Sequence, residues 1–81
     1  EQAEQLVLFP SPTGGLLWLR SSSLGGNATP VEVIDATGRL VLREQAFLHH
    51  RPLDVSALPA GAYLLRVQGP KGWSTARFTK L

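Results

Sequence analysis

The feature that most constrains the fold is the spacing of short apolar segments, which begin about every 8–14 residues along the chain. Between them stand glycine, proline, serine, asparagine or aspartate residues, which favour turns. No segment longer than a turn repeats its apolar residues with the 3.6-residue period of a helix. The sequence therefore predicts an all-β fold of six or seven antiparallel strands, arranged as a sandwich or a barrel.

The segment at residues 58–67 shows how a turn leads into one of these strands. Pro59 supplies the φ angle that suits the second position of a β-turn, and Gly61 suits the last position. In the strand that follows, Tyr63 and every second residue after it share one face. A tyrosine just after such a turn is similar to the tyrosine corner of immunoglobulin-like sandwiches, in which the phenol bonds back across the turn.

The other strands are predicted from the same alternation of apolar and polar residues. We expect Leu17 and Leu19 to face the core and Val41 to point inward. Residues 46–51 predict a loop or an irregular edge, and residues 56–58 a single helical turn. The predicted strands cover residues 6–9, 16–20, 31–35, 40–45, 53–55, 63–67 and 73–81.

The segment Asp35–Gly38 predicts the turn of a β-hairpin with a bulge. Asp35 is expected to bond its own backbone, as aspartates at the start of type I turns do. Gly38 is expected to take the positive φ angle that closes the turn. The acidic side chain is therefore explained by local structure and needs no catalytic role.

Length and composition predict one small domain without disulfides. The chain has 81 residues and no cysteine, so packing between sheets must supply its stability. Its net charge of +2 is too small to favour nucleic acid or an anionic membrane. No apolar run approaches the roughly 20 residues that a membrane-spanning helix needs.

The first residues differ in composition from the rest of the chain. Residues 1–5 are polar and acidic, which predicts the end of a linker and excludes a signal peptide there. Because the chain contains no methionine, we expect it to be a fragment or processed piece of a longer protein. The folded domain is then expected over residues 6–81.

No group of residues predicts a catalytic, metal or cofactor site. His49 and His50 are adjacent, so on a strand they would point to opposite faces and hold a metal poorly. The G-x-S-x-G turn of hydrolases is missing. The pairs Gly14–Gly15 and Gly25–Gly26 do not precede helices, which argues against a phosphate site. An enzyme is therefore the weakest class of function.

A binding function stays open. Trp18 and Trp73 are expected outside the core, where an indole ring can stack on a sugar or meet a neighbouring domain. The arginines are scattered singly, without aromatic side chains between them, which disfavours nucleic acid. One alternative is therefore a carbohydrate- or protein-binding module of a secreted enzyme. An exposed edge strand also leaves a homodimer open.

Three blocks of sequence, in order, resemble the C-terminal sorting domain of type IX secretion, the type A family of the Por secretion system in Bacteroidetes. Leu8–Leu17 is similar to the family's aromatic-Pro-Asn-Pro segment, its glycine and a strand. Val31–Val41 resembles its strand, Asp-x-x-Gly-Arg turn and strand, and Leu53–Val67 with Ala76–Leu81 resembles its last strands. The motif residues are Pro10, Pro12, Gly15, Asp35, Gly38, Arg39, Leu58 and Pro59.

The resemblance covers about residues 6–81 and departs from the family pattern at two positions. Ser11 stands where the family commonly has asparagine, and Phe9 stands where tyrosine is common. Asparagine suits a turn, so Ser11 affects the expected geometry of that turn. The resemblance implies a seven-stranded immunoglobulin-like sandwich.

The resemblance also implies a function, which is a secretion signal without catalysis or cofactor. Such a domain ends a cargo protein and directs it to the type IX translocon, through the periplasm and across the outer membrane. A sortase-like peptidase then removes the domain, and the cargo is secreted or joined to lipopolysaccharide at the cell surface. The implied partners are the translocon, the peptidase and the N-terminal cargo domain.

Within this resemblance, we expect the last strand and its partner strand to present the recognition surface. Tyr63 is expected to anchor that surface, and Gly61 to shape it through the turn. Arg66 and Arg77 are expected to point outward and make contacts. The full set of expected recognition residues is Gly61, Tyr63, Arg66, Arg77, Phe78, Lys80 and Leu81.

Overall fold

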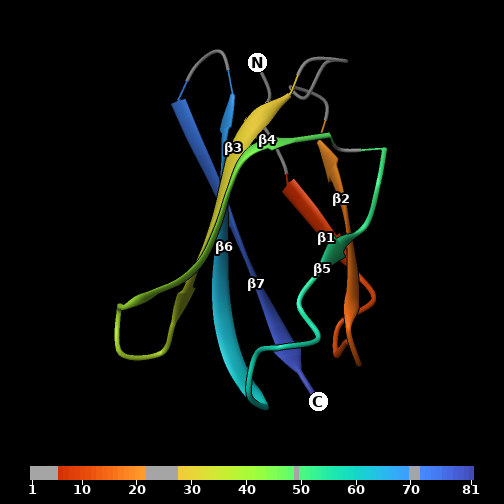
Figure 1. The fold of residues 1–81 in the computed structure, drawn as a ribbon, viewed down its shortest axis with the longest axis vertical. Coiled ribbons are helices and arrows are strands. Elements are labelled where there is room, and N and C mark those ends of the chain that lie inside the picture. Colours follow the sequence, from red (N-terminus) through yellow and green to blue (C-terminus); the bar gives the residue numbers. More distant parts are fainter. Residues whose placement is uncertain (1–5, 22–27, 49, 70–71) are drawn as a thin grey trace.

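The computed structural model describes residues 6–21, 28–48, 50–69 and 72–81 (Figure 1). The predictions for the linker at residues 1–5, for Gly25–Gly26 and for His49 lie outside the described residues. The strands are β1 (Leu6–Phe9), β2 (Leu16–Ser21), β3 (Thr29–Asp35), β4 (Leu40–Phe47), β5 (Leu53–Asp54), β6 (Gly61–Gly69) and β7 (Gly72–Lys80).

The strands form two antiparallel sheets that face each other. One sheet has three strands in the order β1-β2-β5, and the other has four strands in the order β4-β3-β6-β7 (Figure 1). The predicted all-β sandwich of seven strands is therefore confirmed. Within the described ranges, no helix is long and apolar enough to cross a membrane.

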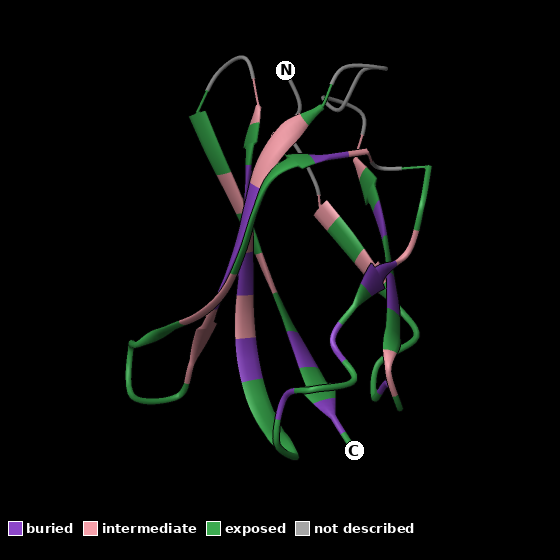
Figure 2. Ribbon diagram, viewed as in Figure 1, coloured by how far each residue is buried: buried purple, intermediate pink, exposed green. Residues whose placement is uncertain are grey.

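The core lies between the sheets and is built from alternate residues of each strand. Figure 2 shows buried positions alternating with exposed ones along β2 and with intermediate ones along β6. Leu17 and Leu19 are buried, as predicted, while Trp18 between them is exposed. The buried apolar side chains are Leu17, Leu19, Val31, Val33, Phe47, Leu53, Val55, Leu58, Tyr63, Leu65, Val67 and Phe78; Val41 packs against them from β4, as expected.

One local prediction was wrong, and another holds in part: the edge strand β4 is irregular near its end, as expected, but it is longer than predicted. Strand β4 continues to Phe47, and the Phe47 ring joins the core. The alternation of apolar and polar residues fades after Leu42, so local sequence did not indicate this extension. Residues 56–58 form no helix. The Ser56 amide donates to Asp54 Oδ1 at 2.9 Å and the Leu58 amide to the Val55 carbonyl at 3.0 Å, which makes two successive turns instead.

The turn between β3 and β4 is held by the carboxylate of Asp35, as predicted. Asp35 Oδ1 accepts hydrogen bonds from the Thr37 amide at 2.9 Å, the Thr37 hydroxyl at 2.6 Å and the Arg39 amide at 3.0 Å. Gly38 has a φ of 89°, a conformation that favours glycine. The bond from the Thr37 hydroxyl, with the Arg39 amide, holds the pKa of Asp35 below its ordinary value of 3.8.

The alternation along β6 generates a test of the fold. Leu65 is fully buried, whereas its neighbour Leu64 faces outward and is half-buried. Replacing Leu65 by Ala should lower the free energy of unfolding by about 2–5 kcal/mol, because it leaves a cavity. Leu64→Ala should cost about 1 kcal/mol or less. Urea denaturation of both variants measures the difference, and equal losses would contradict the register of β6.

The Asp35 turn generates a prediction about pH. A carboxylate with a lowered pKa stabilises the fold above its unfolded pKa, and this contribution is lost as the pH falls through the folded value. Asp35→Asn should therefore lower the urea midpoint at pH 7, and the gap to the wild type should close as the pH falls below 3.8. Thr37→Ala, which removes one of three donors, should show a smaller change of the same sign. A gap that is as wide at pH 2 as at pH 7 would refute this account.

Candidate functional site

The start of β6 is fixed by a tyrosine corner. The Tyr63 hydroxyl donates to the Pro59 carbonyl at 2.6 Å, which confirms the predicted bond back across the turn. The phenol ring is buried and stacks on Phe78 of β7, with ring centroids 5.5 Å apart. One side chain therefore ties the turn before β6 to the strand that ends the chain, and Leu58 of the same turn is also in the core.

The end of β7 is held by the segment that joins β1 to β2, which the sequence did not predict. The Thr13 amide donates to the Thr79 carbonyl and the Leu81 amide donates to the Thr13 carbonyl, both at 2.9 Å. The Thr79 amide donates to Ser11 Oγ at 3.2 Å. Pro10 and Pro12, on either side of Ser11, have no amide hydrogen to compete for these acceptors. The proline-rich motif thus clamps the last strand.

Thr13 itself is almost completely buried, with 1% of its surface exposed. Its hydroxyl donates to the Leu16 carbonyl and accepts from the Gly15 amide at 3.2 Å. A Cβ atom at Gly15 would lie 3.3 Å from the Cβ of Ser56, so the absence of a side chain lets the two segments approach. Packing and hydrogen bonds therefore explain why Thr13 and Gly15 occupy their positions in the Leu8–Leu17 block.

The expected recognition residues separate into two groups by the face on which they lie. Tyr63, Phe78 and Lys80 are buried between the sheets. The outward group has more exposed side chains, including Leu81 at 68%. The outward group consists of Arg66, Arg77 and Leu81, whereas Gly61 is exposed but has no side chain and pairs with buried Lys80. The structure therefore does not bring all seven together on one surface.

A row of charged side chains crosses the outer face of the four-stranded sheet. Glu32 of β3 is buried and accepts a hydrogen bond from Arg66 Nε of β6 at 2.7 Å. Its second oxygen lies 3.6 Å from Arg43 Nε of β4. The Arg66 guanidinium also stacks over the Trp73 ring, 4.9 Å from its centroid. These contacts fix the arginine and the tryptophan in place on the outside of the sheet.

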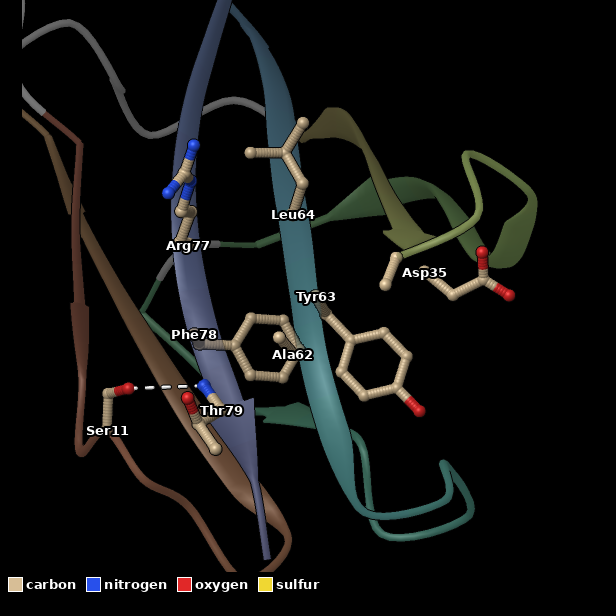
Figure 3. Close-up of a pocket in the computed structure, with 9 residues that line it drawn as sticks. Ser11, Asp35, Ala62, Tyr63, Leu64, Arg77, Phe78 and Thr79 are labelled. Atoms are coloured by element: carbon tan, nitrogen blue, oxygen red, sulfur yellow. Dashed lines mark hydrogen bonds between the residues drawn. The ribbon is translucent and has the colours of Figure 1, made fainter.

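Near the C-terminal end of this face lies a pocket of about 460 Å³ (Figure 3). Ala62 and Leu64 of β6 and Arg77 and Thr79 of β7 line it, together with Ser11 of the clamp. Figure 3 shows the bond between Ser11 and Thr79 at one end of the pocket. The full lining is Ser11, Asp35, Ala36, Ala62, Tyr63, Leu64, Arg77, Phe78 and Thr79.

The two tryptophans lie on opposite sides of the sandwich. Trp18 is on the outer face of the three-stranded sheet, because it alternates with buried Leu17 and Leu19. Trp73 is on the outer face of the four-stranded sheet, where it contacts Arg66. They are 38% and 43% exposed, respectively. A single sugar-binding platform that uses both rings is therefore excluded by this geometry.

The described part of the chain contains no group of three histidine, cysteine, aspartate or glutamate side chains that could hold a metal ion. Asp54 is committed to the turn after β5, where hydrogen bonds from Ser56 hold its pKa below the ordinary value. The chemistry available on the outer face of β6 and β7 is that of recognition, since it consists of guanidinium groups, hydroxyls and apolar side chains.

Comparison with known families agrees with this geometry. The sequence model of the family described as the secretion system C-terminal sorting domain matches residues 7–80, which is essentially the whole sandwich. Neither the comparison with curated proteins nor that with solved structures gives a match. The matched segment contains the proline-rich clamp, the Asp35 turn, the tyrosine corner and the last strand. The chain belongs to the family of C-terminal sorting domains that act as signals for type IX secretion.

Proposed function

We propose that the type IX translocon recognises this domain in its folded form, through the outer face of β6 and β7. The observation that carries the proposal is the alternation along β7, which buries Phe78 and Lys80 and turns Arg77 and Thr79 outward. The buried side chains hold the strand in place, and the outward ones are available for contact. Membership of the sorting-domain family supports the role as an export signal.

A folded signal has a physical advantage over an extended tail. Binding of a flexible segment loses affinity because its backbone and side chains must be ordered on binding. Here the tyrosine corner and the Thr13 clamp have already ordered β6 and β7. The same surface can therefore be presented behind many different cargo domains, because its shape depends on contacts within the sandwich.

We further propose that a sortase-like peptidase removes the domain after export, with attachment of the cargo to the cell surface. The cut is expected at residues 1–5, because these residues are polar and precede the first strand at Leu6. Cleavage there would leave every core strand intact. This would separate the cargo from the signal without unfolding the signal.

A homodimer through an edge strand stays a prediction. The charged residues of edge strand β4 argue against pairing through that strand. Strand β4 is an edge of the four-stranded sheet and carries Arg43 and Glu44 near its centre. Charged residues on an edge strand discourage pairing with a second chain. If two copies of β4 paired antiparallel about a two-fold axis at Arg43 or Glu44, the residue at the axis would face the same residue of the second copy. The two like charges would then repel each other. We therefore expect no pairing of two copies through β4.

The proposal predicts the outcome of an export assay in a bacterium that has the type IX system. A reporter that carries this chain at its C-terminus should reach the medium or the cell surface, and scrambling the order of residues 6–81 should reduce export by at least about tenfold. A fusion with the intact chain at the N-terminus of the reporter is the control for position, and it should be exported less than the C-terminal fusion. N-terminal sequencing of the released domain should show a cut at residues 1–5.

Two results would contradict the proposal. Equal export of the intact and scrambled fusions would remove the role as a signal. A released domain whose N-terminus lies inside a strand would refute only the proposed site of cleavage. Deletion of residues 78–81 is a poor test, because it also removes Phe78 from the core.

A further inference from the structure

The outer face of the four-stranded sheet carries a short apolar row beside its charged side chains. Leu64, Ile34 and Leu40 are direct neighbours across β6, β3 and β4 and form an apolar row. Leu40 is 47% exposed. The solvated face of an antiparallel sheet is ordinarily polar, so this row offers an apolar contact to a partner. Arg77 stands beside Leu64 at the β7 end of the row.

This face also carries an excess of positive charge. The carboxylate of this face, Glu32, is paired with Arg66 and Arg43, and in the adjacent β3–β4 turn Asp35 Oδ2 lies 3.6 Å from Arg39 Nε. No ion pair is found for Arg77 within the described ranges. The arginine with the least compensated charge therefore stands at the end of the apolar row.

Arg77 also borders the pocket of about 460 Å³. In Figure 3, Leu64 stands between Arg77 and Asp35, Ala62 lies nearer to Phe78 and Thr79, and the Asp35 carboxylate points away from Arg77. The small side chain of Ala62 leaves room above the sheet, and Ser11 and Thr79 add oxygen atoms at the far end. A pocket of this size can accept an apolar side chain from a partner.

We propose that the partner element bound at this face is an acidic protein segment, with a carboxylate paired to Arg77 and an adjacent apolar side chain placed over Ala62. This inference rests on the proposed function and names the chemistry of the receptor. A guanidinium without an ion-pair partner binds a carboxylate through two parallel hydrogen bonds. The apolar row from Leu64 to Leu40 would then be covered by the rest of the segment.

The direct test is a titration of the 81-residue chain with synthetic peptides, followed by NMR of the backbone amides. The probe is an acetylated and amidated Glu-Phe-Glu peptide, and the comparison peptide is Lys-Phe-Lys. The acidic peptide should shift the amides of Ala62, Leu64, Arg77 and Thr79, and Arg77→Glu should weaken its binding by about tenfold or more. Arg20→Glu makes the same charge change on the other sheet and should leave the binding unchanged.

Three results would overturn the inference. They are equal shifts with the two peptides, shifts confined to other faces, and binding that Arg77→Glu leaves intact. Vesicles of phosphatidylglycerol provide the test of a lipid partner. If the chain sediments with them and Arg77→Glu abolishes this, an anionic lipid and not an acidic protein segment occupies the face. Arg77 is exposed, so its variants should fold, and circular dichroism checks this.

The export assay separates this inference from the proposed function. Arg77→Glu and Ala62→Leu, which fills the pocket, should each reduce export of the reporter by about tenfold. Arg77→Lys keeps the charge and should retain more export than Arg77→Glu. If both of the first two variants export normally while the scrambled domain does not, the sorting function stands and the proposed site of the partner is wrong.

Discussion

The structure depends most on a short main-chain contact between the beginning and the end of the chain. Within the described residues, backbone hydrogen bonds between segments of the two sheets are found at Thr13, which binds Thr79 and Leu81. Without this contact, the last residues of β7 would lie at an open edge of the sheet, where strand ends fray. The Thr13 contact therefore holds Thr79 and Leu81 against the segment that joins β1 to β2.

This constraint separates buried anchoring residues from outward residues along a single strand. Because side chains on a strand alternate between faces, every second residue of β7 serves the core and the others face the solvent. Phe78 stacks on Tyr63, and Lys80 lies beside the clamp, with its ammonium group donating to the Leu81 carbonyl at 2.8 Å. Substitutions of these residues should affect export by way of stability. Substitutions of Arg77 should affect it without unfolding the domain.

Sequence predicted the features that depend on neighbouring residues. The Asp35 turn, the tyrosine corner and the burial of Leu17 and Leu19 all follow from spacings of a few residues. The clamp joins residues 68 positions apart, as in the bond between Ser11 and Thr79, so no local pattern could reveal it. The same limit applies to the Arg77 pocket, whose lining depends on the register of β6 against β7 and on a loop from the other sheet.

The most direct test of the central contact is hydrogen exchange of the Leu81 amide. This amide donates to the Thr13 carbonyl at 2.9 Å, although Leu81 lies beyond the last strand and its side chain is exposed. An amide held in this way should exchange far more slowly than one in an unstructured peptide. Thr13→Pro removes the Thr13 amide, which donates to the Thr79 carbonyl, and should therefore speed the exchange of the Leu81 amide. Exchange of Leu81 at the rate of an unstructured peptide would contradict the account.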